Sequence, residues 1–380
     1  ELFVMCIECF VDLFFEISKS EAKSLDPQQQ VWLECTFLSF KDAGYTMEGL
    51  RGLNCGVFVA VASGGSTPTR RYDRFTRFET HDISVYDATS KSQSIAAGRI
   101  SYVFDLEGPN CAFDTACSSS LVALLAVISP LKLGECKVAL VIAVNQLFVP
   151  FIFTAFAKAS MLSPSGQCHT WDASADGYLR GEGCGAIVLQ PFDADASSGN
   201  VYANFLGTSV QSDGKSASIR APNGLAQERV IQKALKMSNI KPGDVDYIEA
   251  HGTGTALGDP IEMEALAGVF AESFDRSSLS HSLMVGGVKS NIGHIEIASG
   301  MAGMIKAIFV LEKEYVPPNV GLKKLNPRIE ESIESHNFAV DLPTALETLR
   351  TMSGKDETEL LVAGVSSFGY SGTIIYAVIF

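Results

Sequence analysis

Short apolar segments alternate along this chain with longer segments whose apolar residues recur every three or four positions, and this alternation restricts the fold most. The apolar runs are typical of buried strands, and the periodic segments are typical of helices with one face in a core. Strands are predicted at residues 55–62, 138–144, 186–189, 245–249 and 284–288, and helices at 121–128, 227–237, 261–270 and 298–311. This alternation predicts an α/β fold.

The chain is long and apolar enough to bury a large core, since 47% of its 380 residues are hydrophobic and 19% are charged. Its length is compatible with two or three domains, or with one large fold of two similar halves. The most linker-like segment is the short stretch at 193–200, which is rich in Ser, Ala and Asp. We therefore predict an N-terminal half over 1–197 and a C-terminal half over 198–380.

The net charge of −14 argues against a nucleic-acid partner, because phosphate binding needs clustered Lys and Arg. The longest basic runs are the pairs Arg70–Arg71 and Lys323–Lys324. No apolar run approaches the roughly 18 residues of a membrane span, which predicts a soluble protein. The first residues carry neither Met nor a basic leader, so we expect a truncated N-terminus and leave the compartment, cytoplasmic or organellar, open.

Nine cysteines are scattered over the first half of the chain, and an odd count at irregular spacing does not predict a disulfide framework. Cys6 and Cys9 form a C-x2-C pair, but no second pair follows at the spacing of a zinc site. We expect buried thiols here and no metal.

Cys117 lies in the segment 114–120 (DTACSSS), between a short strand-like run that ends at Phe113 and the apolar helix predicted from Leu121. Unpaired N–H groups and the positive end of the helix dipole would favour its thiolate and lower its pKa. The serines could cap the same helix start. Taken alone, Cys117 is more typical of a buried small apolar residue than of a nucleophile.

His251 follows the predicted strand at 245–249 and opens a Gly- and Thr-rich loop, HGTGT over 251–255. Glycine lets the backbone approach a ligand closely, and the hydroxyls of Thr253 and Thr255 could bond an amide-bearing arm. A structural turn with a surface histidine explains this segment equally well.

His294 lies in a second segment of the same layout, KSNIGHIE over 289–296, between a predicted strand and an Ala- and Gly-rich helix. A histidine and Lys289 at the start of a central helix are costly unless they are paired, so a satisfied His–Lys–Glu network is the alternative explanation. One cysteine and two histidines at strand-to-helix corners of one α/β fold could nevertheless meet in an active site.

These segments resemble the β-ketoacyl synthases, in particular the ketosynthase domains of polyketide synthases. Further matches in the family's order cover nearly the whole chain, at 25–30 (LDPQQQ), 161–164 (MLSP), 176–183 (DGYLRGEG), 221–224 (APNG), 249–262 and 364–373. The resemblance implies a thiolase-like, five-layered α-β-α-β-α fold of two pseudo-symmetric halves. It also implies a homodimer.

The resemblance further implies a decarboxylative condensation. Cys117 would receive an acyl chain from an acyl carrier protein or CoA thioester, and a second carrier would deliver a malonyl or substituted malonyl group. N–H donors from His251 and His294 would stabilise the enolate that decarboxylation produces. Lys289 would hold His294 as a neutral donor, with Glu296 as a possible counter-charge.

Other site residues are also implied. The backbone N–H groups of Cys117 and Tyr370 would form the oxyanion hole. Thr253 and Thr255 would contact the substrate's phosphopantetheine arm, and Phe368 and Tyr370 would also bind the substrate. The chain itself would bind no cofactor and no metal. Whether the product is a fatty acid or a polyketide stays open.

The C-terminal loop departs from the family's usual Gly-Phe-Gly-Gly-Thr-Asn-Ala-His. Tyr370 and Ser371 replace Phe and Gly, and residues 374–376 (Ile-Ile-Tyr) replace Asn-Ala-His. Ser371 could stiffen a hinge that needs unusual dihedral angles. The alternatives are a catalytically weakened scaffold or docking module, which this loop favours, and a thiolase-type acyl-CoA enzyme, which the two histidine segments disfavour.

Overall fold

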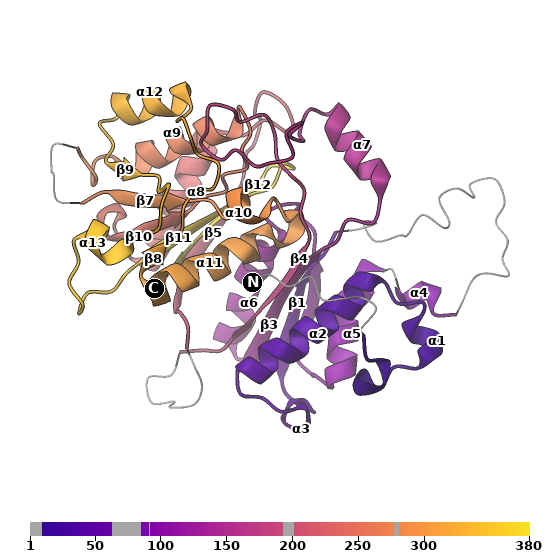
Figure 1. Cartoon of the computed structure of the whole chain (residues 1–380). Helices are drawn as coiled ribbons and strands as arrows, with labels where there is room; N and C mark the ends of the chain where they lie inside the picture. Colours follow the sequence, from indigo (N-terminus) through magenta and orange to yellow (C-terminus); the bar gives the residue numbers. More distant parts are fainter. Residues whose placement is uncertain (1–9, 63–84, 91, 193–200, 277–280) are drawn as a thin grey trace. The chain divides into compact units, whose positions relative to one another are not determined.

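The computed structural model describes residues 10–62, 85–90, 92–192, 201–276 and 281–380, and the chain forms two compact units (Figure 1). Unit 1 comprises Glu1–Asp114, Val122–Thr154 and Gly181–Asn200, and unit 2 comprises Thr115–Leu121, Ala155–Arg180 and Val201–Phe380. The Cys6–Cys9 pair, the Arg70–Arg71 pair and the linker-like stretch at 193–200 lie outside the described residues. The predicted division of the chain after residue 197 stays a prediction.

Unit 1 is built on a four-stranded sheet in the order β2-β1-β3-β4. The strands β1 (Cys55–Ala60), β2 (Asn110–Phe113) and β3 (Val138–Asn145) are parallel, and β4 (Gly183–Leu189) runs antiparallel to β3. Every residue of β1 and β3 is buried, as expected of central strands that read as continuous apolar runs.

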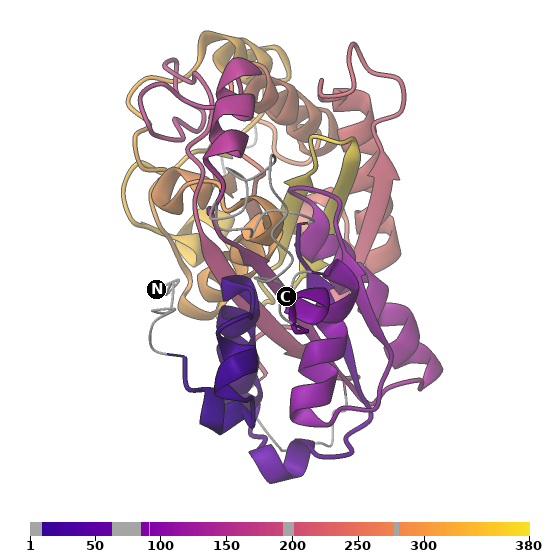
Figure 2. The ribbon, with the colours of Figure 1, turned by 90° about the vertical axis from the view of Figure 1, so that its right-hand side faces the viewer.

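Two long helices, α2 (Pro27–Asp42) and α5 (Gln93–Phe104), pack against this sheet and lie side by side (Figure 2). Asp26 begins α2, because its carboxylate accepts the N–H of Gln28 and Pro27 occupies the first helical position. Other helices described before residue 160 are η2 (Asp12–Phe15), α1 (Lys19–Ala22), α3 (Met47–Leu50), α4 (Asp87–Ser90), α6 (Ser119–Leu133) and α7 (Pro150–Lys158). The last two lie partly in unit 2.

Unit 2 is built on a six-stranded sheet in the order β5-β12-β11-β6-β7-β9. Strands β11 (Ala363–Phe368), β6 (Tyr247–Glu249), β7 (Leu283–Gly286) and β9 (Val340–Asp341) are parallel, while β12 (Thr373–Ile379) runs antiparallel to both β11 and β5 (Phe205–Ser212). Because β11, β6 and β7 are parallel neighbours, the segments that follow them emerge at one edge of the sheet.

The helices of unit 2 cover this sheet. Helix α11 (Ser299–Lys313) packs against β11 and β6, α8 (Gly224–Ser238) packs against β5 and β12, and α9 (Gly258–Phe270) packs against α8 and α12 (Pro327–Ser335). The smaller elements are η5 (Pro242–Asp244), α10 (Lys289–Ile292), η6 (Glu296–Ala298), α13 (Leu349–Ser353) and the two-stranded sheet of β8 (Tyr315–Val316) with β10 (Glu347–Thr348).

The structure confirms each strand and helix predicted from the sequence, with shifted ends. The largest shift is in α6, which runs beyond residue 128 through Pro130 to Leu133. The segment Ala116–Leu133 is also long and apolar enough to cross a membrane by length and composition alone, contrary to the expectation that no segment approaches this limit. Core helices of soluble proteins share this composition, and Ala123, Leu124 and Val127 of this helix are buried.

Gly364 in β11 allows the buried Tyr376 of β12 to lie directly against the neighbouring strand. A Cβ atom at residue 364 would collide with the hydroxyl and ring of Tyr376. We predict that Gly364→Ala lowers the free energy of unfolding by about 2–3 kcal/mol, as expected for overpacking a closed core. Denaturant unfolding measures this change.

Gly98 provides the control, because it lies inside helix α5 and a Cβ atom there meets no heavy atom within 4 Å. Gly98→Ala should raise the free energy of unfolding by about 0.5–1 kcal/mol, since alanine is the better helix former. Equal effects of the two substitutions would contradict this account of β11 and β12.

Candidate active site

Cys117 lies in a tight turn between the end of β2 and the start of α6, where the sequence predicted a strand-to-helix corner. The preceding residue, Ala116, has a left-handed backbone with φ of 56°, which is uncommon for a residue with a side chain. The carbonyl oxygen of Cys117 accepts hydrogen bonds from the hydroxyls of Ser299 (3.1 Å) and Ser367 (2.8 Å). These bonds attach the turn to helix α11 and strand β11.

The serines after Cys117 stabilise the same turn. Ser118 and Ser119 donate to the carbonyl oxygens of Thr115 and Ala116, and the Ser119 hydroxyl also accepts the N–H of Thr115 at 2.7 Å. Ser120 accepts the backbone N–H of Met301 from α11 at 2.9 Å. The polar run after the cysteine therefore makes the turn a rigid part of unit 2.

His294 lies directly beside the thiol, with its Nε2 atom 3.1 Å from the Sγ atom of Cys117. The backbone N–H of Glu296 donates to Nδ1 of His294 at 3.2 Å, so Nδ1 is an acceptor and the neutral ring carries its proton on Nε2. The Nε2–H group therefore points to the sulfur as a donor. The backbone of His294 is itself held by a 2.7 Å bond to the carbonyl oxygen of Leu179.

His251 follows β6 at the same edge of the sheet, and its ring centroid lies 5.7 Å from that of His294. The backbone N–H of Phe368, at the end of β11, donates to Nδ1 of His251 at 3.3 Å. This bond also assigns the proton of the neutral ring to Nε2. The turn after His251 is held by Glu262, whose carboxylate accepts the N–H groups of His251 (2.7 Å) and Gly252 (2.8 Å).

Burial keeps both imidazoles neutral. It lowers the pKa of His251 and of His294 well below the usual value of 6.5, and the positive charge of Lys289 lowers both further. The same burial lowers the pKa of Lys289, while the charges of Glu249 and Glu262 oppose this shift. The site therefore presents two neutral N–H donors at neutral pH, an arrangement that suits negative charge developing on a nearby oxygen.

The expected pairing of Lys289 with Glu296 is wrong. The Glu296 carboxylate instead accepts two hydrogen bonds from Arg180, at 2.6 and 2.8 Å, so its charge is already paired. The direct contact that orients the His294 ring comes from the backbone N–H of Glu296. Lys289 acts on His294 through its charge.

The expected lowering of the Cys117 pKa is also wrong. Burial raises the pKa of this thiol to about 12, and the negative charge of Glu296 adds to the increase. The charge of Lys289 and the backbone N–H groups of Tyr370 and Cys117 oppose it. Removal from water outweighs the effect of the helix start, because a buried thiolate loses the solvation that stabilises its charge.

The C-terminal loop keeps its turn despite the two replacements. Gly372 has a left-handed backbone with φ of 90°, while Ser371 has no positive φ and needs no unusual backbone. The turn is closed by the N–H of Gly369, which donates to the carbonyl oxygen of Thr373 at 2.8 Å. Ile374, Ile375 and Tyr376 are fully buried in β12, so these replacements are part of the core.

Thr253 and Thr255 lie in the loop between His251 and helix α9. Their hydroxyls are 3.2 Å apart, and the Thr255 hydroxyl also accepts the N–H of Gly258 at 3.1 Å. Asp259, at the start of α9, accepts the N–H of Gly254 at 3.1 Å. This loop is therefore ordered by local bonds, and its two threonine hydroxyls lie close together.

Sequence reasoning gave no role to several residues that support this site, namely Glu262, Asp259, Arg180 and Tyr178. Arg180 and Tyr178 lie inside the DGYLRGEG segment, and the Tyr178 ring packs edge-on against His294 with centroids 4.9 Å apart. The available signal was the charge of Arg180 beside the apolar residues of this motif, since a charged side chain requires a partner wherever it is buried.

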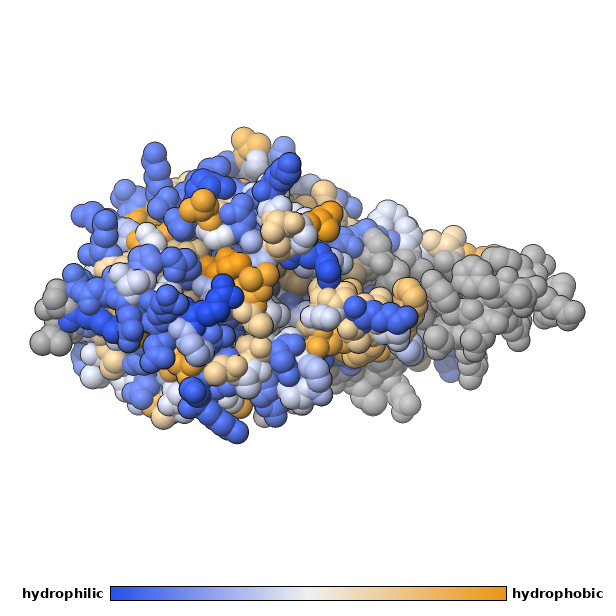
Figure 3. Space-filling view, turned by 90° about the horizontal axis from the view of Figure 1, so that it is seen from above, coloured by the Kyte–Doolittle hydropathy of each residue, from blue (hydrophilic) through white to orange (hydrophobic). Residues whose placement is uncertain are grey.

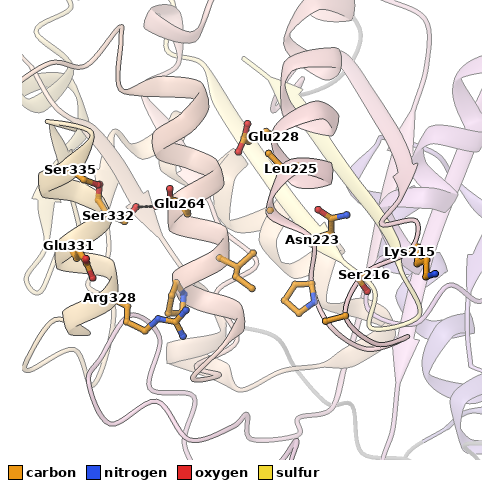
Figure 4. A pocket seen from close by; sticks show the side chains of 15 residues that line it. Lys215, Ser216, Asn223, Leu225, Glu228, Glu264, Arg328, Glu331, Ser332 and Ser335 are labelled. Atoms are coloured by element: carbon orange, nitrogen blue, oxygen red, sulfur yellow. Dashed lines mark hydrogen bonds between the residues drawn. The ribbon is translucent and has the colours of Figure 1, made fainter.

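A pocket elsewhere in unit 2 lies between α8, α9 and α12 (Figure 4). Its lining includes Lys215, Asn223, Glu228 and Arg328, and the Ser332 hydroxyl donates to Glu264 at its edge. It contains none of the predicted site residues, so its shape gives no information about the site around Cys117.

The fold and the cluster around Cys117 define a thiolase-like protein. A solved ketosynthase from module 6 of the bacillaene synthase of Bacillus subtilis 168 is 36% identical, with a TM-score of 0.84 over 98% of this chain and 62% of that one. The oxazolomycin ketosynthase domain of Streptomyces albus JA3453 is 31% identical, with a TM-score of 0.88 over 99% of this chain and 63% of that one.

The chain belongs to the β-ketoacyl synthase family. Residues 1–195 match the family model "Beta-ketoacyl synthase, N-terminal domain", and residues 202–323 match "Beta-ketoacyl synthase, C-terminal domain". These matches confirm the resemblance and the α/β, thiolase-like fold predicted from the sequence. Members of this family are condensing acyltransferases that need no cofactor of their own.

Polyketide synthases are among its relatives. The chain is 40% identical to a phenolphthiocerol/phthiocerol polyketide synthase of Mycobacterium tuberculosis over 374 residues, which make up 96% of this chain. It is 39% identical to another polypeptide of the phenolphthiocerol/phthiocerol polyketide synthase from the same species, over 99% of this chain. It spans only 16% and 19% of the length of these two relatives.

The lowered pKa values of His251 and His294 predict how the free energy of unfolding depends on pH. In the unfolded chain a histidine binds a proton below about pH 6.5, whereas the folded protein, with its lowered pKa values, does not. The unfolded state therefore binds more protons as pH falls below 6.5. The free energy of unfolding should drop by up to about 1.4 kcal/mol per pH unit for each histidine.

Denaturant unfolding between pH 5 and 7 measures this slope. His251→Asn and His294→Asn should each make it shallower by up to about 1.4 kcal/mol per pH unit. Slopes equal to that of the wild-type protein would contradict the assignment of two neutral imidazoles.

Proposed function

We propose that this chain is a ketosynthase that joins a Cys117-bound acyl group to a malonyl or substituted malonyl thioester with loss of CO₂. The observation that supports this most strongly is the 3.1 Å contact between Nε2 of His294 and Sγ of Cys117, with the His251 ring 5.7 Å from that of His294. A nucleophile and two neutral donors are thereby gathered at one place.

In the first step, Cys117 attacks the carbonyl carbon of an acyl thioester. The backbone N–H groups of Cys117 and Tyr370, which both favour negative charge at this sulfur, form the oxyanion hole for the tetrahedral intermediate. When the intermediate collapses, the carrier's sulfur leaves. The proton of the Cys117 thiol is transferred to that leaving sulfur, so no net proton is consumed.

In the second step, the malonyl thioester loses CO₂, and the bonding electrons form an enolate on its thioester oxygen. The Nε2–H groups of His251 and His294 donate to this oxygen, and burial together with the charge of Lys289 keeps both rings neutral. The enolate carbon then attacks the acyl–Cys117 carbonyl. The Cys117 sulfur leaves as a thiolate and takes up one proton from water, which restores the thiol, and the β-ketoacyl product remains on the carrier.

The substrates arrive on the phosphopantetheine arm of an acyl carrier protein, or on CoA. We assign contacts with this arm to the neighbouring hydroxyls of Thr253 and Thr255, and we place Phe368 and Tyr370 beside the acyl group. Phe368 supports this place because its ring centroid lies 5.5 Å from that of His251. The relatives are polyketide synthases, so we propose a polyketide product.

We also propose that the chain acts as a homodimer. Helix α7 is rich in apolar residues, none of them fully buried, and Phe151 is 70% exposed. The face seen in Figure 3 carries hydrophobic residues among hydrophilic ones. An apolar helix of this kind fits a protein–protein contact better than water, and sedimentation velocity of the chain measures its oligomeric state.

Replacement of Cys117 tests the nucleophile. Cys117→Ala should lower condensation by at least roughly 10³-fold, because the acyl thioester intermediate forms on the Cys117 sulfur. Product formation from acyl and malonyl thioesters is the measurement. Cys111→Ser, which changes an exposed thiol six residues earlier, is the control and should condense like the wild-type protein.

Replacement of His294 tests whether this residue acts in decarboxylation and not in the acylation of Cys117. His294→Ala should slow decarboxylation of the malonyl thioester by about 10²–10³-fold, the effect expected for losing one oxyanion donor. Acylation of Cys117 should be largely retained. CO₂ release and acyl-enzyme formation are measured separately, and an equal loss of both would count against the assigned role.

A further inference from the structure

Arg180 and Glu296 form the most buried bidentate ion pair among the described residues. The Nε and Nη2 atoms of Arg180 donate to the two carboxylate oxygens of Glu296 at 2.6 and 2.8 Å. Their side chains are only 4% and 14% exposed. Two parallel charge-assisted bonds fix the direction of the carboxylate as well as its distance, so this pair constrains the Glu296 side chain strongly.

The backbone of Glu296 has an uncommon conformation, with φ of 42°. Left-handed backbone is unfavourable for a residue with a side chain and persists only where the surroundings hold it. In this conformation the N–H of Glu296 points back to Nδ1 of His294 at 3.2 Å. The bond that fixes the protonation of the His294 ring therefore depends on a backbone geometry that the chain would not adopt by itself.

The chain around Arg180 also holds His294 directly. Residues 180 and 294 form an isolated parallel bridge, in which the N–H of His294 donates to the carbonyl oxygen of Leu179 at 2.7 Å. The Arg180 segment therefore contacts the His294 loop twice, through its backbone at His294 and through its side chain at Glu296.

The guanidinium of Arg180 also contacts the C-terminal loop indirectly. It lies over the ring of Phe156, 5.3 Å from the centroid, and Phe156 packs edge-on against Tyr370 with centroids 6.1 Å apart. The backbone N–H of Tyr370 is one of the two backbone groups that favour negative charge on Cys117. One arginine thus joins the loop of His294 to the loop of Tyr370.

We propose that Arg180 and Glu296 are positioning residues, whose ion pair holds the Glu296 backbone so that its N–H keeps His294 in the Nε2–H form directed at Cys117. This inference rests on the proposed function, because it concerns the donor used in decarboxylation. A merely structural ion pair would stabilise the fold without setting the protonation of one histidine ring.

Removal of the guanidinium is the first test. Arg180→Met keeps much of the apolar volume, and we expect malonyl decarboxylation to fall at least tenfold while the folded protein remains. The control is Arg350→Met, because Arg350 makes an equivalent bidentate pair with Glu314, directly after the far end of helix α11. This control should leave decarboxylation unchanged. Wild-type decarboxylation by Arg180→Met would overturn the proposal.

Two substitutions of Glu296 separate backbone geometry from charge. Both Glu296→Ala and Glu296→Gly remove the carboxylate, but only glycine adopts a φ near +42° without a steric cost. If the backbone conformation is what matters, the glycine variant should retain several-fold more decarboxylation than the alanine variant. Equal losses would overturn the proposal. If Arg180→Met does not fold, the comparison of Glu296→Ala with Glu296→Gly still tests the proposal.

A spectroscopic measurement detects the ring directly and needs no activity. In the full chain labelled with ¹⁵N-histidine, the His294 signals, identified by their loss in His294→Asn, should show one Nε2–H form. Arg180→Met should give a mixture of the two neutral forms, and an unchanged spectrum would overturn the proposal. A wild-type chain that shows the single form but does not decarboxylate would instead overturn the proposed function.

Discussion

Two backbone N–H groups that donate to the Nδ1 atoms of His294 and His251 are the interactions on which the rest of the site depends. They come from Glu296 and from Phe368, at 3.2 and 3.3 Å, and they leave each neutral ring with its proton on Nε2. Because the donors belong to the backbone, their protonation does not change with pH. The chemistry assigned to the histidines needs this form, since a neutral imidazole with its proton on Nδ1 could not donate to the enolate from Nε2.

Burial favours the chemistry assigned to the two histidines and disfavours the thiolate of Cys117. It keeps the histidines neutral, which favours them as donors, and it raises the pKa of Cys117 to about 12, which disfavours its thiolate. The two backbone N–H groups at the sulfur and the charge of Lys289 partly offset that effect. The site is therefore suited to stabilising negative charge while a reaction proceeds more than to holding a free thiolate beforehand.

Much of the site was predictable because it follows from local patterns. Each of the segments around Cys117, His251 and His294 lies between a strand and a helix, and neighbouring parallel strands bring the two histidine segments to one edge of a sheet. The partners of charged groups were not predictable in this way. Arg180 and Glu296 are 116 residues apart, so only the tertiary structure shows that Glu296 pairs with Arg180.

The raised pKa of Cys117 was missed for a similar reason. The sequence shows the helix start that favours a thiolate, but it does not show the side chains that remove the sulfur from water. The expectation that Ser371 could stiffen the C-terminal loop had the same origin. The sequence shows that Ser371 replaces glycine, and only the backbone shows that Gly372 carries the left-handed conformation of the turn.

The central claim is that Cys117 alone carries the acyl group, and mapping of acylated peptides tests it most directly. The full chain is incubated with a mixed pool of acyl thioesters, digested and examined by mass spectrometry. The account predicts that Cys117 is the cysteine that carries the adduct and that the mass of the adduct reports the preferred acyl length. Equal labelling of other cysteines, or an unmodified Cys117, would contradict it.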